Sequence, residues 1–461
     1  MAPFDPSTFD DLIFGKMSET KLPSVAATVI EDGRVVRQRA YGYKNNGAAL
    51  PATPQTLYGI GSITKSFIAV SVAKLVEAGK MDFHDPVTKF LPLKQKAFEG
   101  VEVHHLLSHT SGIPGLGALE VSLSTSFGEY HHWLPISGVE DMSSFMSDVD
   151  DWVEAKPGAK YHYLNEGFVL LGEIVSRASG KPWERFLKEE VLTPLKMSRT
   201  FTQKTDVDAD NDVATPYAIR GTKVTPTPMP YGSGAAGGMM SNVVDLTNYL
   251  KMFIDGGEFE GRRILGRDTL EKMETPYAKR PAKYDDGGLY GYALVIHPDF
   301  HGHKVVGHGG SVDVFTSSMR YVRDLKSGVV LLSNGTGYSI TLLAMCAISQ
   351  LTGHDPNELP WFRLDNLLDN LQGHYRTYKG TLYAEVRKVG SFLMLSGEDI
   401  GKNIVLVPDG EEGSIARFYT FDEGARLEVN FRFNERGIEL LYERYRYRRS
   451  GPLQPQPPPQ I

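Results

Sequence analysis

A serine followed three positions later by a lysine occurs three times in this sequence, and each pair could combine a nucleophile with its own base. The pairs are Ser18 with Lys21, Ser62 with Lys65, and Ser71 with Lys74. A serine hydroxyl is a weak nucleophile until an adjacent base takes its proton. The motif is short and common, so its surroundings in the chain must separate the three pairs.

Ser62 follows the stretch YGIG, which suits a turn that exposes the first residue of a helix. Its hydroxyl would then lie near unpaired helix N–H groups, whose dipole favours developing negative charge. Lys65 would share its helix face, whereas Ser71 would point to the opposite side, and Ser18 has no strand before it. This stretch alone favours a plain helix N-cap with a solvated lysine.

Two further motifs follow in order along the chain. The stretch YHYLNEGFVLLG contains Tyr163-Leu164-Asn165, and VVGHGGSVDVF contains His308-Gly309-Gly310. Tyrosine and histidine are ionisable groups that can move protons, and lysine and tyrosine have unperturbed pKa values near 10.4 and 10. The pKa of each group must therefore move toward 7 for the group to exchange protons at that pH. We expect burial to lower the pKa of the lysine and a neighbouring ammonium to lower that of the tyrosine.

The elements that must position these residues follow from patterning. Residues 24–47 alternate apolar and polar side chains around Asp32-Gly33, which predicts a hairpin, and residues 62–79 have helical periodicity. Helices and long loops fill 100–260, strands return over 290–334, and a helix follows over 341–353. Strands at both ends with a helical insertion predict one α/β (α+β) domain over residues 1–354.

The composition changes after that point. Residues 355–370 indicate a linker with a short helix, and about seven strand-like runs over 371–449 predict a small all-β barrel or sandwich. Residues 450–461 are rich in proline and predict a mobile tail.

Composition excludes several classes of function. The net charge is −7 and no long basic run occurs, which argues against nucleic acid or an anionic membrane as a partner. The single cysteine, Cys346, lies in an apolar run and is expected to be buried. No apolar run is long enough to span a membrane, and the first residues lack the pattern of a secretory signal, so we expect a cytoplasmic protein.

Four histidines raise the question of a metal site: His297, His301, His303 and His308. If His303 and His308 share a strand, their odd separation places them on opposite faces, so they would not converge. We therefore predict no metal and no cofactor.

With LLSHTSGIPG (106–115) and GAAGGMMSNVVDL (234–246), these motifs make the chain resemble the penicillin-recognising serine hydrolases over residues 10–352. The resemblance is strongest to the group of class C β-lactamases, D-Ala-D-Ala carboxypeptidase B-type peptidases, D-aminopeptidases and related esterases. It implies an antiparallel sheet flanked by helices, with an all-helical subdomain. It also implies that the C-terminal strands form a lipocalin-like barrel, as in some peptidase members.

The resemblance also implies roles for individual residues. Ser62 would be the nucleophile, Lys65 would deprotonate it, and Tyr163 would be the second acid/base, with Tyr161 as a nearby rival. His308 in the third motif would be a further catalytic residue, whose neutral imidazole would orient the Ser62–Tyr163 pair. Asn165 would contact Lys65 or the substrate amide, and Gly309 and Gly310 would let substrate lie close. The N–H of Ser311 would complete an oxyanion hole with that of Ser62.

These roles lead to the expectation of a serine hydrolase that forms an acyl-enzyme on Ser62. A D-aminopeptidase, or a peptidase that tolerates D-amino acids, is expected to cleave small peptides; a carboxylesterase or a β-lactamase is the alternative. A non-hydrolytic ligand-binding or sensor protein is the alternative of another class, and a homo-oligomer is left open. His109 is expected to stabilise a turn. Asp313 is either a surface or capping residue or a substrate contact, and the same alternatives are open for Glu166.

Overall fold

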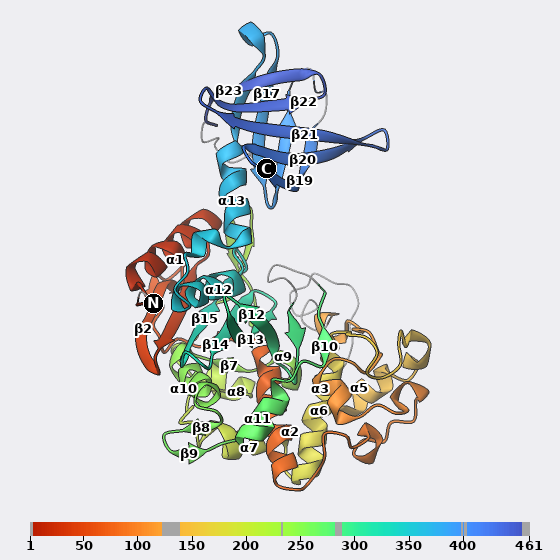
Figure 1. The fold of residues 1–461 in the computed structure, drawn as a ribbon. Coiled ribbons are helices and arrows are strands. Elements are labelled where there is room, and N and C mark those ends of the chain that lie inside the picture. The colour runs from red at the N-terminus through yellow and green to blue at the C-terminus, as the bar shows by residue number, and fades with distance from the viewer. Residues whose placement is uncertain are drawn as a thin grey trace. The chain divides into compact units, whose positions relative to one another are not determined.

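The structure is a computed structural model that describes residues 3–121, 139–231, 234–281, 288–397, 400 and 403–453. The chain divides into two compact units, residues 1–354 and 355–461 (Figure 1). Of the tail predicted at 450–461, residues 454–461 lie outside the described part. Within the described residues, no helix is both long and apolar enough to span a membrane.

A nine-stranded antiparallel sheet forms the centre of the first unit, in the order β10-β11-β12-β13-β14-β15-β1-β2-β3. The first strands and the last strands of the unit meet where β1 pairs with β15, which confirms the predicted sheet built from both ends of the domain. Asp32 and Gly33 both have positive φ in the turn between β1 and β2, as a tight hairpin requires. The strands are β1 (Ser24–Glu31), β2 (Arg34–Asn45), β3 (Leu50–Pro51), β10 (Ala278–Lys279), β11 (Leu289–Tyr290), β12 (Val295–Phe300), β13 (His303–Val312), β14 (Phe315–Val322) and β15 (Ser327–Ser333).

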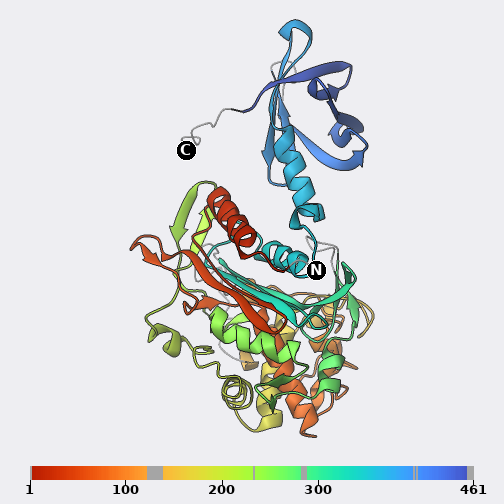
Figure 2. The same ribbon diagram turned by 60° about the vertical axis from the view of Figure 1, so that its left-hand side comes forward.

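Helices cover both faces of this sheet (Figure 2). On one face lie α1 (Pro6–Thr20) and α12 (Ile340–Leu351), which packs against β14 and β15 and buries Cys346. On the other lie α10 (Val243–Ile254) and α2 (Ile63–Glu77), which packs against β13. The other described α-helices of this unit are α3 (Val103–Leu107), α5 (Val139–Phe145), α6 (Asn165–Ser179), α7 (Trp183–Leu187), α8 (Lys204–Asp208), α9 (Gly234–Gly237) and α11 (Arg267–Met273).

Helix α2 is the buried centre of the unit, and 12 of its 15 residues are buried. Its sequence is apolar on all sides, which is the pattern of a core helix rather than a surface one. Side chains such as Phe67 and Ile68 each stabilise the fold by about 1.5–3 kcal/mol through burial. The start of α2, where Ser62 lies, is therefore anchored by the surrounding core.

The second unit is a closed antiparallel barrel of eight strands. They are β16 (Gly373–Arg376), β17 (Tyr383–Val389), β18 (Phe392–Ser396), β19 (Ile404–Glu412), β20 (Ile415–Asp422), β21 (Ala425–Asn434), β22 (Gly437–Tyr442) and β23 (Tyr445–Gly451). The predicted number of about seven is one too few, because the last run divides into β22 and β23 at Glu443, whose φ is 50°. Closure leaves no free strand edge in the barrel.

The segment 355–370, which the sequence suggests as a linker with a short helix, forms the helix α13 (Pro360–Leu371). Leu368 and Leu371 of α13 are fully buried in the core of the barrel. The periodicity of this helix buries one apolar stripe against strands that are distant in the sequence, so the segment is part of the barrel unit rather than a connection alone.

Candidate active site

Ser62 lies in a tight turn at the start of α2, directly after the short strand β4 (Tyr58–Gly59). Ser62 occupies the N-cap position of α2, but its side chain makes no capping hydrogen bond to the helix N–H groups. Lys65 is buried rather than solvated. Gly61 has φ 51°, and a Cβ on it would lie 2.6 Å from the backbone nitrogen of Ser311. Only glycine permits this turn, which brings the backbone of Gly61 against that of Ser311 in β13.

Lys65 is fully buried one helical turn beyond Ser62. Its Nζ lies 3.0 Å from Ser62 Oγ, 2.8 Å from Asn165 Oδ1 and 2.5 Å from the carbonyl oxygen of Ala236 in α9. Burial lowers the pKa of Lys65 to about 7, opposed by the negative charges of Glu120 and Glu166. This agrees with the expected direction, and a substantial share of the molecules has a neutral amine at pH 7.

The three neighbours of Lys65 Nζ define where its lone pair points. The Asn165 and Ala236 oxygens are acceptors only, so each must receive a hydrogen from Nζ. A neutral amine has two hydrogens and one lone pair, so the lone pair is left facing the Ser62 hydroxyl. The geometry thus suits removal of the Ser62 proton by Lys65.

Tyr163 is the tyrosine that meets the nucleophile. Its hydroxyl forms a hydrogen bond with Ser62, and Lys65 Nζ lies 4.9 Å from the centre of its ring. The ring of Tyr161 instead lies against Tyr290, at 5.4 Å between centres. Burial raises the pKa of Tyr163 well above its usual range, although the bond to Ser62 opposes this. The expected lowering of this pKa by a neighbouring ammonium is therefore wrong, because burial outweighs the opposing cation, which is Arg280, and Tyr163 is a phenol.

His109 fixes the turn that carries Tyr163. Its Nδ1 accepts a hydrogen bond of 3.0 Å from the Leu164 N–H, and its carbonyl accepts one of 2.8 Å from the His162 N–H. Its ring lies 4.1 Å from that of Tyr163, and its φ of 58° is unusual for a residue other than glycine. These contacts confirm the prediction of a turn-stabilising side chain.

His308 is buried on β13. Its Nε2 lies 2.9 Å from the Tyr290 hydroxyl, and its Nδ1 donates to the Gly309 carbonyl. Both ring nitrogens thus bind groups other than Ser62 and Tyr163. Burial lowers the pKa of His308 to about 3, so the imidazole is neutral at pH 7.

The two glycines after His308 allow β13 to approach the turn before Ser62. A Cβ on Gly310 would lie 2.0 Å from the Ile60 carbonyl oxygen, and one on Gly309 would lie 2.9 Å from Thr341 Oγ1. The expected reason, room for substrate, is incomplete, since Ile60 of the protein itself occupies the space beside Gly310. Ser311 is exposed just beyond this contact.

Three acidic residues near the motifs differ in their surroundings. Glu166 is buried and its Oε1 accepts a hydrogen bond of 2.9 Å from the Ala118 N–H. Asp313 is exposed in the turn between β13 and β14, with φ 52°. Glu120, which sequence reasoning missed, accepts a hydrogen bond of 2.7 Å from Asn165 Nδ2. It lies 45 positions from Asn165, and its only sequence signal is its place shortly after LLSHTSG.

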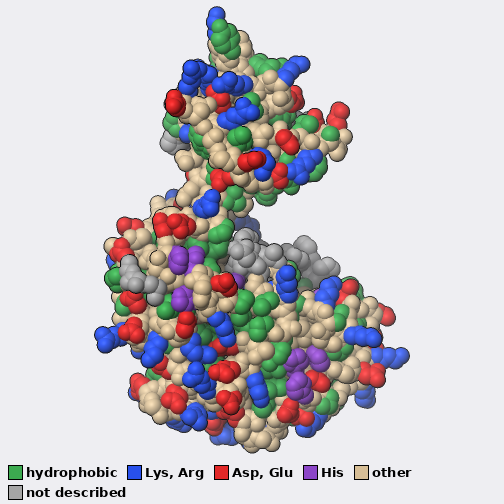
Figure 3. Space-filling model, in the orientation of Figure 1, with side chains coloured by type: hydrophobic (Ala, Val, Ile, Leu, Met, Phe, Trp, Pro, Cys, Tyr) green, Lys and Arg blue, Asp and Glu red, His purple; other side chains and the backbone are tan. Residues whose placement is uncertain are grey.

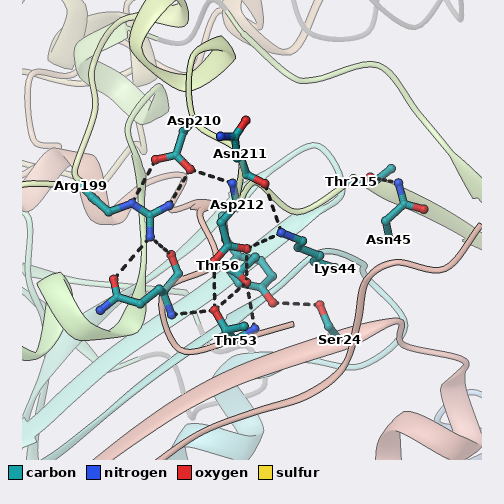
Figure 4. Close-up of polar contacts among 12 residues, drawn as sticks. Ser24, Lys44, Asn45, Thr53, Thr56, Arg199, Asp210, Asn211, Asp212 and Thr215 are labelled. Atoms are coloured by element: carbon teal, nitrogen blue, oxygen red, sulfur yellow. Dashed lines mark hydrogen bonds and ion pairs between the residues drawn. The ribbon is translucent and has the colours of Figure 1, made fainter. Parts of the chain in front are cut away.

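A polar network anchors the segment that leads into the nucleophile turn (Figure 4). Asp212 accepts hydrogen bonds from Lys44, Thr53 and Thr56 at 2.7, 3.0 and 2.8 Å. Arg199 pairs with Asp210 at 2.6 Å. The carboxylates of this acidic stretch are thus bound by cations and hydroxyls of the protein and hold residues 53–57 in place ahead of β4.

The histidines considered for a metal site have separate partners. His303 Nδ1 lies 2.6 Å from Asp324, and the His301 ring stacks on that of His354 at 4.0 Å. Across the described ranges, no group of three or more His, Cys, Asp or Glu side chains is placed to hold a metal ion. On the face in Figure 3, Lys and Arg side chains are interspersed with Asp and Glu side chains.

Comparison with known proteins finds a matching family model for each of the two units. Residues 9–340 match the family model described as Beta-lactamase, and residues 356–448 match the Pab87 octamerisation domain. Protein flp of Staphylococcus aureus is 23% identical over 358 residues, which cover 75% of this chain but only 66%, just under two thirds, of that protein. Penicillin-binding protein 4 of Amycolatopsis lactamdurans is 26% identical over 359 residues, covering 72% of this chain and 86% of that protein.

Among solved structures, the octameric penicillin-binding protein homologue from Pyrococcus abyssi is 40% identical, with a TM-score of 0.89 over 96% of this chain and 99% of that one. A D-stereospecific amidohydrolase from a Streptomyces species is 23% identical, with a TM-score of 0.62 over 74% of this chain and 98% of that one. This second likeness concerns the fold of the first unit.

Proposed function

The chain belongs to the β-lactamase family of serine hydrolases, and we propose that it cleaves amide bonds of small peptides through an acyl-enzyme on Ser62. The observation that carries this proposal is the buried Lys65, whose Nζ lies 3.0 Å from Ser62 Oγ and whose pKa burial lowers to about 7. A base with a pKa near the working pH is the most effective proton acceptor.

Acylation begins when the neutral amine of Lys65 takes the Ser62 proton. Ser62 Oγ then bonds to the substrate carbonyl carbon, and the carbonyl oxygen becomes an oxyanion. The N–H groups of Ser62 and Ser311 would stabilise that charge, each contribution being worth about 3–4 kcal/mol in comparable sites. The close approach of Gly61 to the Ser311 backbone supports this assignment.

Collapse of this intermediate breaks the bond to the leaving amine, which must receive a proton to depart. The phenol of Tyr163, hydrogen-bonded to Ser62, supplies it, and the proton held by Lys65 returns to Tyr163. A water molecule then attacks the acyl carbon, with Lys65 taking its proton. Lys65 returns this proton to Ser62 Oγ as the ester bond breaks, which releases the acid product and restores the neutral amine.

The phenol state of Tyr163 favours amide over ester substrates. An amine leaving group is a poor one unless it is protonated as the bond breaks, whereas many alkoxide or phenoxide groups leave without such help. Tolerance of D-amino acids rests on the family resemblance of the three motifs. A carboxylesterase or a β-lactamase is the alternative within the family, and a ligand-binding protein without hydrolysis is the alternative outside it.

The deciding experiment compares purified protein with its Ser62→Ala variant on D- and L-aminoacyl amides, short peptides, p-nitrophenyl esters and a chromogenic β-lactam. Turnover of D-aminoacyl amides that disappears in Ser62→Ala supports the proposal. Turnover confined to esters or to the β-lactam selects the corresponding alternative, and no turnover with any class favours the ligand-binding protein.

We also propose that the chain assembles as a homo-octamer through its barrel. The support is the match of residues 356–448 to an octamerisation domain and the 40% identity to an octameric relative over 96% of this chain. Light scattering should give a mass of about 409 kDa, eight times the 51.1 kDa of one chain. A monomer or dimer at micromolar concentration would contradict this assembly.

A further inference from the structure

Glu120 is an exposed carboxylate at the edge of the candidate site that the chemistry above does not use. The residues before it are fixed, because Ala118 and Leu119 are buried and the Ala118 N–H donates to Glu166 Oε1. Glu166 lies in the first turn of α6, beside Asn165. The backbone leading to Glu120 is thus anchored to the same helix end that carries Asn165.

A chain of hydrogen bonds joins Glu120 to the nucleophile. Glu120 Oε1 accepts from Asn165 Nδ2 at 2.7 Å, and Asn165 Oδ1 accepts from Lys65 Nζ at 2.8 Å. Lys65 Nζ lies 3.0 Å from Ser62 Oγ. With the width of one amide, these contacts place the Glu120 carboxylate no more than about 11 Å from Ser62 Oγ, the span of roughly three extended residues.

Two charged side chains act on the candidate site with opposite sign. Glu120 contributes a negative charge that raises the pKa of both Lys65 and Tyr163. The cation of Arg280 lowers the pKa of both Tyr163 and His308. Glu120 is the carboxylate that contacts Asn165, so a substrate lying beside Asn165 meets a negative group.

We propose that Glu120 binds the ammonium group of a free N-terminal amine, so that the preferred substrates are short peptides or amino-acid amides with an unblocked N-terminus. This inference rests on the proposed acyl-enzyme at Ser62. An ionised carboxylate can accept several hydrogen bonds, so the contact with Asn165 leaves capacity for an ammonium, which has three donors. Such charge-assisted bonds are the stronger kind.

The test is a protection experiment on the full-length protein, which needs no knowledge of the leaving group. A fluorophosphonate labels Ser62, measured by intact mass, in the presence of 1-aminoethylboronic acid or its N-acetyl form, each as both enantiomers. Boronic acids add reversibly to the serine hydroxyl. In the wild type, the free-amine boronate of the preferred enantiomer should protect at a concentration at least about tenfold lower than the acetylated one.

Glu120→Gln removes the charge but retains an oxygen that can accept from Asn165. It should reduce the advantage of the free amine to below about threefold and leave protection by the acetylated boronate unchanged. Glu120→Asp keeps the charge and should retain part of the advantage. Glu189→Gln is the matched control, since Glu189 is a surface carboxylate paired with Lys181 and Arg185, and it should behave as the wild type.

Equal protection of the wild type by both boronates would overturn the inference. A parallel loss of both in Glu120→Gln would also overturn it, because Glu120 would then act only by orienting Asn165. Equal protection by a boronate whose sole amine is on its side chain would overturn the N-terminal assignment. Absence of any Ser62 labelling in the wild type would instead overturn the proposed function.

Discussion

Two serine–lysine pairs with the same spacing lie along helix α2, one beginning at its N-cap and one inside it, and their surroundings differ. Ser62 lies at the first turn with its hydroxyl bonded to Lys65 and Tyr163. Ser71 lies in the middle, where its hydroxyl donates to the Phe67 carbonyl at 2.9 Å, and Lys74 Nζ donates to the Ile264 carbonyl at 3.0 Å. In the second pair the lysine and serine bind backbone carbonyls rather than each other.

The difference shows that the helix end, rather than the motif, supplies the chemistry. At the start of a helix there is no preceding turn whose carbonyl could accept a hydrogen bond from the serine hydroxyl. The first N–H groups of the helix have no intrahelical partners. In the interior of a helix, a serine hydroxyl can donate a hydrogen bond to the carbonyl four residues earlier. Ser71 and Lys74 are therefore internal controls for Ser62 and Lys65.

The largest expected effect separates the two serines. Ser62→Ala should lower kcat by about 10⁴ to 10⁶, because it removes the nucleophile. Ser71→Ala loses one internal hydrogen bond and should keep kcat within about threefold. Steady-state kinetics on one amide substrate checks both, and comparable losses in the two variants would break the comparison.

The second largest effect on kcat should separate Lys65 from Lys74. Lys65→Arg keeps a positive charge but cannot serve as a base, since arginine stays protonated, so kcat should fall by about 10³ or more. Lys74→Arg should change kcat by less than about threefold, because Lys74 contacts backbone and a surface carboxylate. Circular dichroism and thermal unfolding of both variants check that folding is retained. Full activity of Lys65→Arg would exclude a base role.

A smaller effect should separate the two tyrosines. Tyr163→Phe removes only the hydroxyl and should lower kcat on amides by about 10² or more, and less on p-nitrophenyl esters, whose leaving group needs no proton. Tyr161→Phe should have little effect on either. Activity lost in Tyr161→Phe and retained in Tyr163→Phe would show that the other tyrosine is the proton donor.

The smallest effect concerns the barrel. All the side chains placed at the candidate site lie before residue 312, so a chain ending at His354 should still be labelled at Ser62, within about tenfold of the wild-type rate. Its mass by light scattering should be that of a monomer or small oligomer. A folded truncated chain with no labelling would show that the barrel supplies part of the site.

The site motifs could be found in the sequence because each combines residue types with a local signal. YGIG marks the turn before Ser62, and YLN places a tyrosine two positions before the asparagine that begins α6. Glu120 and Tyr290 could not be found in this way, since their contacts with Asn165 and His308 join distant positions. The raised pKa of Tyr163 also follows from burial, which only packing reveals.

Some parts of the fold could also be predicted from the sequence, and others could not. Alternation around Asp32-Gly33 predicts the hairpin of β1 and β2, and the helical periodicity of residues 62–79 predicts α2. The division between β22 and β23 depends on Glu443, which has a positive φ although it is not glycine. Nothing in the sequence predicts this conformation. The docking of α13 on the barrel depends on strands that follow it.

The central claim is that Lys65 deprotonates Ser62, and the pH dependence of Ser62 labelling by an uncharged fluorophosphonate tests it most directly. Because burial lowers the pKa of Lys65 to about 7, the amine is protonated below that pH and neutral above it. The labelling rate should therefore fall about tenfold per pH unit below 7 and level off above about pH 8. In Glu120→Gln the midpoint should move to lower pH, since the charge of Glu120 raises the pKa of Lys65. A rate that is independent of pH between 5 and 9, or one that rises only above pH 9, would contradict the account.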